Sequence, residues 1–228
     1  QLGSCGSDAS VKLWDSSSGR CIRTFRGHEN RVRSVAFNPR GQQFASGSHD
    51  QTIKIWEVST GNCVSTIKGH KDEVWSVVYG PDGQQLASSS YDQTVRLWNV
   101  DTGACTQTFR GHEGRVWSVA FSSDGQQLAS CSDDQTVKLW NVHTGDCIQT
   151  LQGHTGLVWS VAFSPDGELL ASGSFDNTIR VWKIRTGRCI LVIDERVCVG
   201  LDITGATGLT SGQRTALGLM GAMKSSSI

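Results

Sequence analysis

The chain has 228 residues, of which 37% are hydrophobic and 18% are charged, and its formal net charge is zero. Because no basic run interrupts this balance, the sequence lacks the electrostatic footprint of a nucleic-acid-binding protein. It also contains no signal peptide and no apolar run long enough to cross a membrane, which says nothing of sequence upstream of Gln1. We therefore expect a cytoplasmic protein that binds neither nucleic acid nor a membrane.

The chain is built from a unit that repeats every 42 residues without an insertion. A fixed period of about 40 to 45 residues indicates a repeat array. The complete units occupy residues 27–68, 69–110, 111–152 and 153–194, and residues 1–26 form a partial unit. Two positions of the unit show the period most clearly. One holds Trp14, Trp56, Trp98, Trp140 and Trp182, and the other holds His28, His70, His112 and His154.

The partial unit opens the chain. Residues 2–7 (LGSCGS) match residues 44–49, which belong to the second strand expected for the next unit, so the opening unit lacks its first strand. The chain also starts without Met. We therefore expect it to be a piece of a longer protein.

Each complete unit contains four short segments that alternate apolar and polar residues. In the third complete unit these are residues 116–121 (VWSVAF), 127–132 (QLASCS), 136–140 (TVKLW) and 147–151 (CIQTL). Short segments of this kind, bounded by Gly, Asp, Pro or Ser, are typical of antiparallel strands. One unit is therefore predicted to be a four-stranded meander. Such a sheet cannot bury both apolar faces alone, so the units must stack, and radial stacking gives a β-propeller.

Two motifs of the unit resemble those of the WD-repeat family. Gly-His pairs stand at 27–28, 69–70, 111–112 and 153–154, and a Trp followed by Asp, Glu, Asn or Lys closes each third strand. The resemblance covers residues 2–194. It implies an all-β WD-repeat β-propeller with four complete four-stranded blades plus a partial first blade, occupying residues 1–194 and followed by a non-repeat tail, residues 195–228.

The tail departs from the repeat pattern. Residues 197–203 have the composition of a strand, and residues 210–213 (TSGQ) have the spacing of a capping box before a short helix. The run ITGATGLT at 203–210 resembles a signature that follows repeat arrays in bacterial, especially cyanobacterial, NACHT and NB-ARC signalling proteins. This resemblance implies the sensor end of a STAND-type signalling ATPase, although no Gly-x-x-x-x-Gly-Lys-Ser/Thr phosphate loop occurs in this chain.

Every complete unit carries a Ser, a His and an Asp, a combination that performs hydrolysis elsewhere. If the hairpin turns around Asp134 and Gln135, Ser130 lies opposite Trp140, and the indole, hydroxyl, imidazole and carboxylate can form one hydrogen-bonded chain. Because the set recurs in every unit without a Gly-x-Ser-x-Gly elbow, we predict a structural network and no catalytic residue. The family resemblance implies the same network, in four sets: His28, Ser46, Asp50 and Trp56; His70, Ser88, Asp92 and Trp98; His112, Ser130, Asp134 and Trp140; and His154, Ser172, Asp176 and Trp182.

Five of the eight cysteines occupy one equivalent position per unit, in the fourth strand: Cys21, Cys63, Cys105, Cys147 and Cys189. Equivalent positions in neighbouring blades are too far apart for a disulfide. We therefore expect buried free thiols in a reducing compartment. No Cys-x-x-Cys pair occurs, and neither a metal nor a cofactor is expected.

Function is expected where the units differ. The variable positions lie between Gly-His and the next Val, directly after that Val, and before the turn Asp; the resemblance places them on the top of the disc around the central channel. Aromatic residues and Arg, which are enriched at interface hot spots, are frequent among them. Alternatively, the three Trp residues of this set belong to the repeat consensus and pack between blades. The candidate partner-binding residues are Arg31, Arg33, His49, Glu73, Trp75, Tyr91, Arg115, Trp117, Asp133, Leu157, Trp159 and Phe175.

These features predict a non-catalytic scaffold that binds a protein or peptide segment. The alternative is a hydrolase or a lectin-like small-ligand propeller, which would need a set of channel-lining residues found in one unit only. Because at most five blades are present and the family commonly closes with about seven, three assemblies remain open. These are a five-bladed ring completed by residues 197–203, an open arc that self-associates, and a fragment of a larger ring, which we favour.

Overall fold

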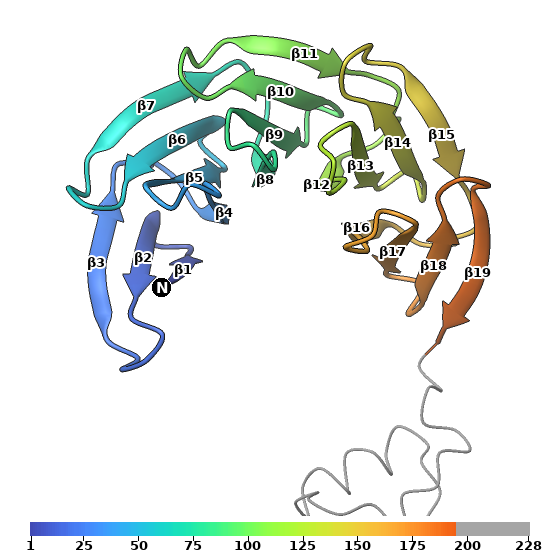
Figure 1. Cartoon of the computed structure of the whole chain (residues 1–228), viewed down its shortest axis with the longest axis horizontal. Coiled ribbons are helices and arrows are strands. Elements are labelled where there is room, and N and C mark those ends of the chain that lie inside the picture. Colours follow the sequence, from blue (N-terminus) through green and yellow to red (C-terminus); the bar gives the residue numbers. More distant parts are fainter. Residues whose placement is uncertain (195–228) are drawn as a thin grey trace, which may run out of the picture.

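A computed structural model describes residues 1–194 of the chain. Within this range the protein forms nineteen strands and no helix, so the predicted all-β class is confirmed, as are the four complete four-stranded sheets and the partial first one. The strands make five antiparallel sheets that follow one another along an open arc (Figure 1). The strand and the helix expected in the tail lie outside the described residues.

Each sheet is a meander in which strands consecutive in sequence are hydrogen-bonded neighbours. The first sheet holds β1 (Leu2–Cys5), β2 (Ser10–Trp14) and β3 (Cys21–Arg26). The second holds β4 (Val32–Phe37), β5 (Gln43–Ser48), β6 (Thr52–Glu57) and β7 (Cys63–Lys68). The third holds β8 (Val74–Tyr79), β9 (Gln85–Ser90), β10 (Val95–Asn99) and β11 (Cys105–Phe109). The fourth holds β12 (Val116–Phe121), β13 (Gln127–Ser132), β14 (Val137–Asn141) and β15 (Cys147–Leu151). The fifth holds β16 (Val158–Phe163), β17 (Leu169–Ser174), β18 (Ile179–Lys183) and β19 (Arg188–Ile193).

Within each sheet the strands follow one another from the inside of the arc to its outer rim. In the four-stranded sheets the first strand is innermost and the fourth is outermost (Figure 1). Burial is greatest in the second strand, where five of the six residues of β5 are buried. It falls to three of six in β6, and in β7 only Ile67 is buried. A strand that is buried on both faces needs a continuous apolar or small-residue sequence, and β5 (QFASGS) and β9 (QLASSS) have it.

The hydrophobic core is divided into layers between neighbouring sheets. Between the second and third sheets, Ile53 and Ile55 pack with Val74, Val77 and the indole of Trp98. The same arrangement recurs between the first and second, third and fourth, and fourth and fifth sheets. No sheet therefore has a core of its own, as expected for units that are stable only when stacked.

The predicted register between the second and third strands is wrong by two residues. Ser130 pairs with Lys138, and Trp140 pairs with Leu128. The observed pairing is centred on Asp134 and not on Gln135, which has a left-handed conformation (φ 67°) and donates its amide to the carbonyl of Ser132. Since Leu128 and Ser130 lie on the same face of β13, the indole of Trp140 reaches the hydroxyl diagonally across the strand pair.

The cysteines of the fourth strands are free, but the prediction that they are buried is wrong. Four of the five are exposed and the fifth, Cys189, is half-buried, because they lie at or near the start of the outermost strand of each sheet. An alternating sequence does not tell an outer strand that faces solvent from an inner one. Of the seven described cysteines, only Cys131 is buried. No helix within residues 1–194 is long and apolar enough to span a bilayer.

Candidate interaction surface

The two edges of the sheets carry different connections. We call top face the edge that carries the loops between sheets, such as residues 69–73, and the turns between second and third strands, such as residues 91–94. The bottom face carries the other turns, such as residues 80–84 and 100–104. This separation follows from the meander, because alternate connections of antiparallel strands lie at opposite ends.

Backbone hydrogen bonds join the variable positions of the top face in pairs. The amide of Tyr91 donates to the carbonyl of Glu73 at 3.0 Å. The same bond links Arg31 to His49, Arg115 to Asp133 and Leu157 to Phe175. The inter-sheet loop and the turn of each four-stranded sheet are therefore held side by side, so residues about 18 positions apart in the sequence form one surface.

The innermost strand of each complete sheet contains a β-bulge, which changes the direction of one side chain near the top face. In β8, Val74 pairs with Ser90 and Ser76 pairs with Ser89, so Trp75 is the extra residue. A bulge bends its strand and redirects the extra side chain. The register shift occurs at the same position in all four complete sheets, where the extra residues are Arg33, Trp75, Trp117 and Trp159. Sequence reasoning selected these four positions but did not predict the bulge.

Beneath this surface, each complete sheet contains the predicted Trp–Ser–His–Asp set within hydrogen-bonding distance. In the third sheet Trp98 Nε1 donates to Ser88 Oγ at 2.8 Å, and Ser88 Oγ lies 2.7 Å from His70 Nε2. His70 Nδ1 lies 2.8 Å from Asp92 Oδ2. The other three complete sheets repeat these contacts at 2.7–2.8 Å. In the three-stranded first sheet, Trp14 Nε1 donates to Ser4 Oγ at 2.7 Å.

The protonation states of the set follow from its environment. Burial lowers the pKa of His70, which favours the neutral imidazole. Burial raises the pKa of Asp92, but hydrogen bonds, the largest from His70, outweigh it and keep the pKa well below its usual range. A neutral His70 that donates from Nδ1 to Asp92 accepts the Ser88 hydroxyl proton at Nε2, so every donor has an acceptor.

The hydroxyls of these sets are closed to substrates. Ser46, Ser88 and Ser130 are 0% exposed and Ser172 is 1% exposed. Each hydroxyl oxygen already accepts an indole N–H and faces an imidazole. The Ser hydroxyl of each set therefore cannot act as a nucleophile. A nucleophile must contact both its general base and the substrate, and these hydroxyls have no access to a substrate.

On the top face, residues of the second, third and fourth sheets form one cluster of aromatic rings and guanidinium groups. Trp75 and Tyr91 are stacked, with ring centroids 5.0 Å apart and an interplanar angle of 17°. Trp117 meets both rings edge-on, at 4.5 and 5.1 Å. The guanidinium carbon of Arg33 lies 4.5 Å from the Trp75 centroid, and that of Arg115 lies 4.5 Å from the Tyr91 centroid. We call these five residues the arginine–aromatic cluster.

Three polar residues hold this cluster in place. Arg33 Nε donates to His49 Nε2 at 2.7 Å, and His49 Nδ1 lies 3.1 Å from Glu73 Oε1. Burial lowers the pKa of His49, which keeps Nε2 available as an acceptor. Trp117 Nε1 donates to Asp133 at 2.5 Å. Burial also raises the pKa of the Tyr91 hydroxyl to about 12, so that the stacked phenol is neutral.

The remaining candidate residues lie outside this cluster. Arg31 is exposed, and its side chain makes no hydrogen bond or ion pair within residues 1–194. Leu157 is half-buried. On the fifth sheet, Trp159 and Phe175 form an edge-to-face pair at 5.2 Å and are 56% and 61% exposed. The predicted surface is therefore divided into the arginine–aromatic cluster and the exposed apolar pair of Trp159 and Phe175.

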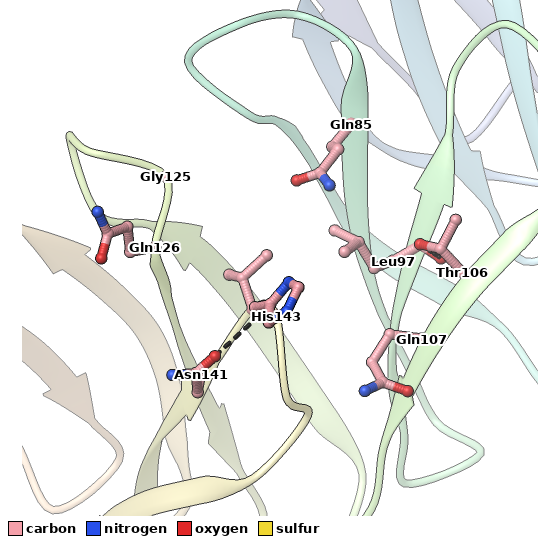
Figure 2. A pocket seen from close by; sticks show the side chains of 9 residues that line it. Gln85, Leu97, Thr106, Gln107, Gly125, Gln126, Asn141 and His143 are labelled. Carbon is pink, nitrogen blue, oxygen red and sulfur yellow. Dashed lines mark hydrogen bonds between the residues drawn. The ribbon is translucent and has the colours of Figure 1, made fainter.

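The bottom face contains a groove that the sequence analysis did not predict. It has a volume of about 430 Å³ and lies between the third and fourth sheets (Figure 2). Its polar lining includes Gln85, Gln107, Gln126, Asn141 and His143. Each residue occupies an ordinary strand or turn position, so only the juxtaposition of two sheets brings the amides together. No group of three His, Cys, Asp or Glu side chains within the described chain is placed to hold a metal ion.

Comparison with known families gives four matches in register with the repeat. The family model described as WD domain, G-beta repeat matches residues 19–57, 61–99, 103–141 and 145–183. Each match starts near the outermost strand of one sheet and continues through the first three strands of the next, as residues 19–57 do with β3 and then β4, β5 and β6. The matched unit is thus offset by one strand from the sheet.

Curated relatives match over single segments. The chain is 46% identical over 39 residues to Nuclear distribution protein PAC1 of Mycosarcoma maydis, covering 17% of this chain and 9% of that protein. It is 51% identical over 47 residues to Guanine nucleotide-binding protein subunit beta of Oryza sativa subsp. indica, covering 20% and 12%. It is 45% identical over 47 residues to Pre-mRNA-processing factor 17 of Homo sapiens, covering 20% and 8%. Each match therefore spans about a tenth of the relative.

Proposed function

Because the four family matches cover more than half of its residues, the chain belongs to the WD-repeat family, and we propose that it is a protein-interaction scaffold whose top face binds a protein or peptide segment. The arginine–aromatic cluster is the observation that carries this proposal. It combines exposed guanidinium groups with half-buried rings that pack on one another, and Asp133 holds the indole of Trp117 by a hydrogen bond. Rigid aromatic and Arg side chains make strong contacts, because little conformational entropy is lost when a partner binds.

The cluster differs from the shared network beneath it in a way that supports recognition. The Trp–Ser–His–Asp set is the same in every complete sheet and is buried. The residues above it change from sheet to sheet: Arg33 contacts His49, whereas Trp75 contacts Tyr91 at the equivalent positions. Repeat proteins share the residues that build the scaffold, so a surface that varies between repeats is suited to one particular partner.

The scaffold is proposed to be non-catalytic, cytoplasmic and without binding to nucleic acid or membranes. The zero net charge of the sequence supports the lack of nucleic-acid binding, and the buried hydroxyls of the four sets support the lack of catalysis. A hydrolase or lectin-like channel is the alternative function. It would depend on a set of residues found in one sheet, whereas the Ser-His-Asp sets occur in all four complete sheets.

A sharper form of the proposal makes this chain the sensor end of a STAND-type signalling protein of the NACHT or NB-ARC kind. Its support is the resemblance of residues 203–210, which lie outside the described residues. In that form, a partner captured on the top face would release a nucleotide-binding module encoded elsewhere in the same protein. A reading frame without such a module upstream of Gln1 would contradict this form and leave the scaffold function untouched.

A peptide-display selection tests the scaffold function even while the partner is unidentified. Peptides enriched on the whole chain are expected to lose at least about tenfold in affinity when Tyr91, Arg115 or Phe175 is changed to Ala, which is the effect of removing one hot-spot residue. The matched control is His143→Ala in the bottom groove, which should leave affinity unchanged. Circular dichroism melts establish that each variant is folded. Peptides that respond only to His143→Ala would place the interface on the bottom face and refute the proposal.

A further inference from the structure

The two arginines of the cluster have unused hydrogen-bonding capacity. Arg33 Nε donates a hydrogen bond to His49, and the two terminal nitrogens of Arg33 make no hydrogen bond or ion pair within residues 1–194. The guanidinium of Arg115 makes none at all within the same range. Both residues are exposed. A guanidinium that lies over an aromatic ring uses its face and leaves the in-plane N–H groups free for a planar anion.

The acidic residues of the surface form no ion pair with these two arginines. Glu73 is engaged by His49 Nδ1 at 3.1 Å, and Asp133 accepts the indole N–H of Trp117. Neither carboxylate lies within 4.0 Å of Arg33 or Arg115, since no ion pair joins them among the described residues. Arg31, also exposed, adds a third positive charge next to the cluster.

The spacing of the two arginines is bounded by the stack between them. The steps from Arg33 to Trp75, from Trp75 to Tyr91 and from Tyr91 to Arg115 measure 4.5, 5.0 and 4.5 Å. The guanidinium carbons are therefore no further apart than these three steps together. An extended peptide covers that distance in about four residues, at ~3.3 Å per residue.

We propose that the arginine–aromatic cluster binds an extended acidic peptide segment, in which two carboxylates up to about four residues apart pair with Arg33 and Arg115. The proposal rests on the scaffold function above and names the chemistry of its partner. The carboxylates bind the in-plane donors of the two guanidinium groups. The peptide backbone between them crosses the edges of the Trp75 and Tyr91 rings.

Fluorescence anisotropy with synthetic probes tests the charge and the spacing. The probes are fluorescein-labelled 12-residue peptides of Gly, Ser and Thr that carry two Glu residues two, four or eight positions apart. Matched probes carry Gln, Lys or phosphoserine instead. With the whole chain at low salt, the tighter-binding of the two-residue and four-residue Glu probes is expected to bind at least about tenfold more tightly than its Gln counterpart and than the eight-residue Glu probe.

Variants of the chain locate the binding. Arg33→Gln and Arg115→Gln should each weaken the binding of the tighter of these two Glu probes about tenfold, the cost of one charged hydrogen-bonded pair. Asp133→Asn keeps an acceptor for Trp117 while removing a negative charge, so it should strengthen binding about twofold to threefold. Arg40→Gln, an exposed arginine of the bottom face, is the control and should have no effect.

The outcomes separate this inference from the scaffold function. Equal binding of the Glu and Gln probes, or Glu binding unchanged by Arg33→Gln and Arg115→Gln, would overturn the acidic partner. Saturable binding of only the phosphoserine probe would replace carboxylates by phosphates and also overturn it. If the Gln or Lys probe binds and Tyr91→Ala abolishes that binding, the top face is an interface of different specificity. If no probe binds up to millimolar concentration, the acidic partner is refuted, and the display selection alone decides the scaffold function.

Discussion

Replacing Trp98 by Ala should remove a large part of the stability of the sheet stack. The indole is 1% exposed, packs between the second and third sheets, and lies against Gly69, where an added Cβ would be 2.9 Å from its Cη2 atom. Burial of a whole Trp side chain removes about 200 Å² from water, worth ~5 kcal/mol at ~25 cal/mol per Å². Measured Trp→Ala losses in cores are about 3–5 kcal/mol, and we expect Trp98→Ala to fall in this range.

The chain offers a matched control for this substitution. Trp159 occupies the bulge of the fifth sheet and is 56% exposed, so Trp159→Ala should cost less than about 1 kcal/mol. Trp98→Phe keeps most of the apolar volume but removes the N–H that Ser88 Oγ accepts at 2.8 Å. Its expected loss is about 1–3 kcal/mol, the range for a buried polar group that loses a partner.

Urea unfolding followed by far-ultraviolet circular dichroism measures these differences, because the shift of the midpoint multiplied by a common m-value gives the change in the free energy of unfolding. Tryptophan fluorescence is less suitable for the comparison, since each substitution removes one of the eight indoles that contribute to the signal. If Trp98→Ala destabilises the chain no more than Trp159→Ala does, the indole is not part of the core, and the structural role assigned to the four Trp–Ser–His–Asp sets is wrong.

Three further predictions address the backbone, the buried charges and the thiols. Gly69→Ala should cost at least about 1–3 kcal/mol more than Gly19→Ala, because both glycines have positive φ but only Gly69 faces an indole; equal midpoints in urea would contradict the clash. The pKa values of His70 and Asp92 are both lowered on folding, so the unfolded chain binds more protons. The free energy of unfolding should therefore be level above about pH 7, fall as the pH drops through ~6.5 and fall further below ~4; urea midpoints that rise in acid would reverse the assigned sign. A thiol reagent should label the outer-strand cysteines of the native chain within minutes but spare the buried Cys131, whose pKa burial raises, until urea is added; rapid native labelling of Cys131 would show that the fourth and fifth sheets separate.

The sequence was sufficient for the fold because the same pattern is repeated in every unit. Strands such as β12 and β13 begin and end where the alternation of apolar residues begins and ends. The register of Trp140 was not predictable in this way. It depends on the left-handed conformation of Gln135, and a Gln gives no local signal for positive φ of the kind a Gly gives.

The candidate surface was predictable as a set of positions but not as an arrangement. Periodicity identified Trp75 and Tyr91 as variable neighbours of the repeated scaffold. That Arg33 and Arg115 lie over their rings depends on the bulges and on the angle between neighbouring sheets. The prediction that the outer-strand cysteines are buried was wrong for a related reason. Apolar and polar residues alternate in the outer strands as they do in the inner ones, and only the order of strands across the sheet determines which strand faces solvent.

The offset between repeat and sheet affects how modules of this array can be exchanged. A graft cut on the repeat frame, such as residues 61–99, carries the outer strand of one sheet and the three inner strands of the next, so both sheets become hybrids. A graft cut on the sheet frame, such as residues 69–110, transfers one intact sheet and confines every foreign contact to the two seams on either side. For transplanting one facet of the top surface into another array, the second cut is the conservative one, although an alignment of repeats would suggest the first.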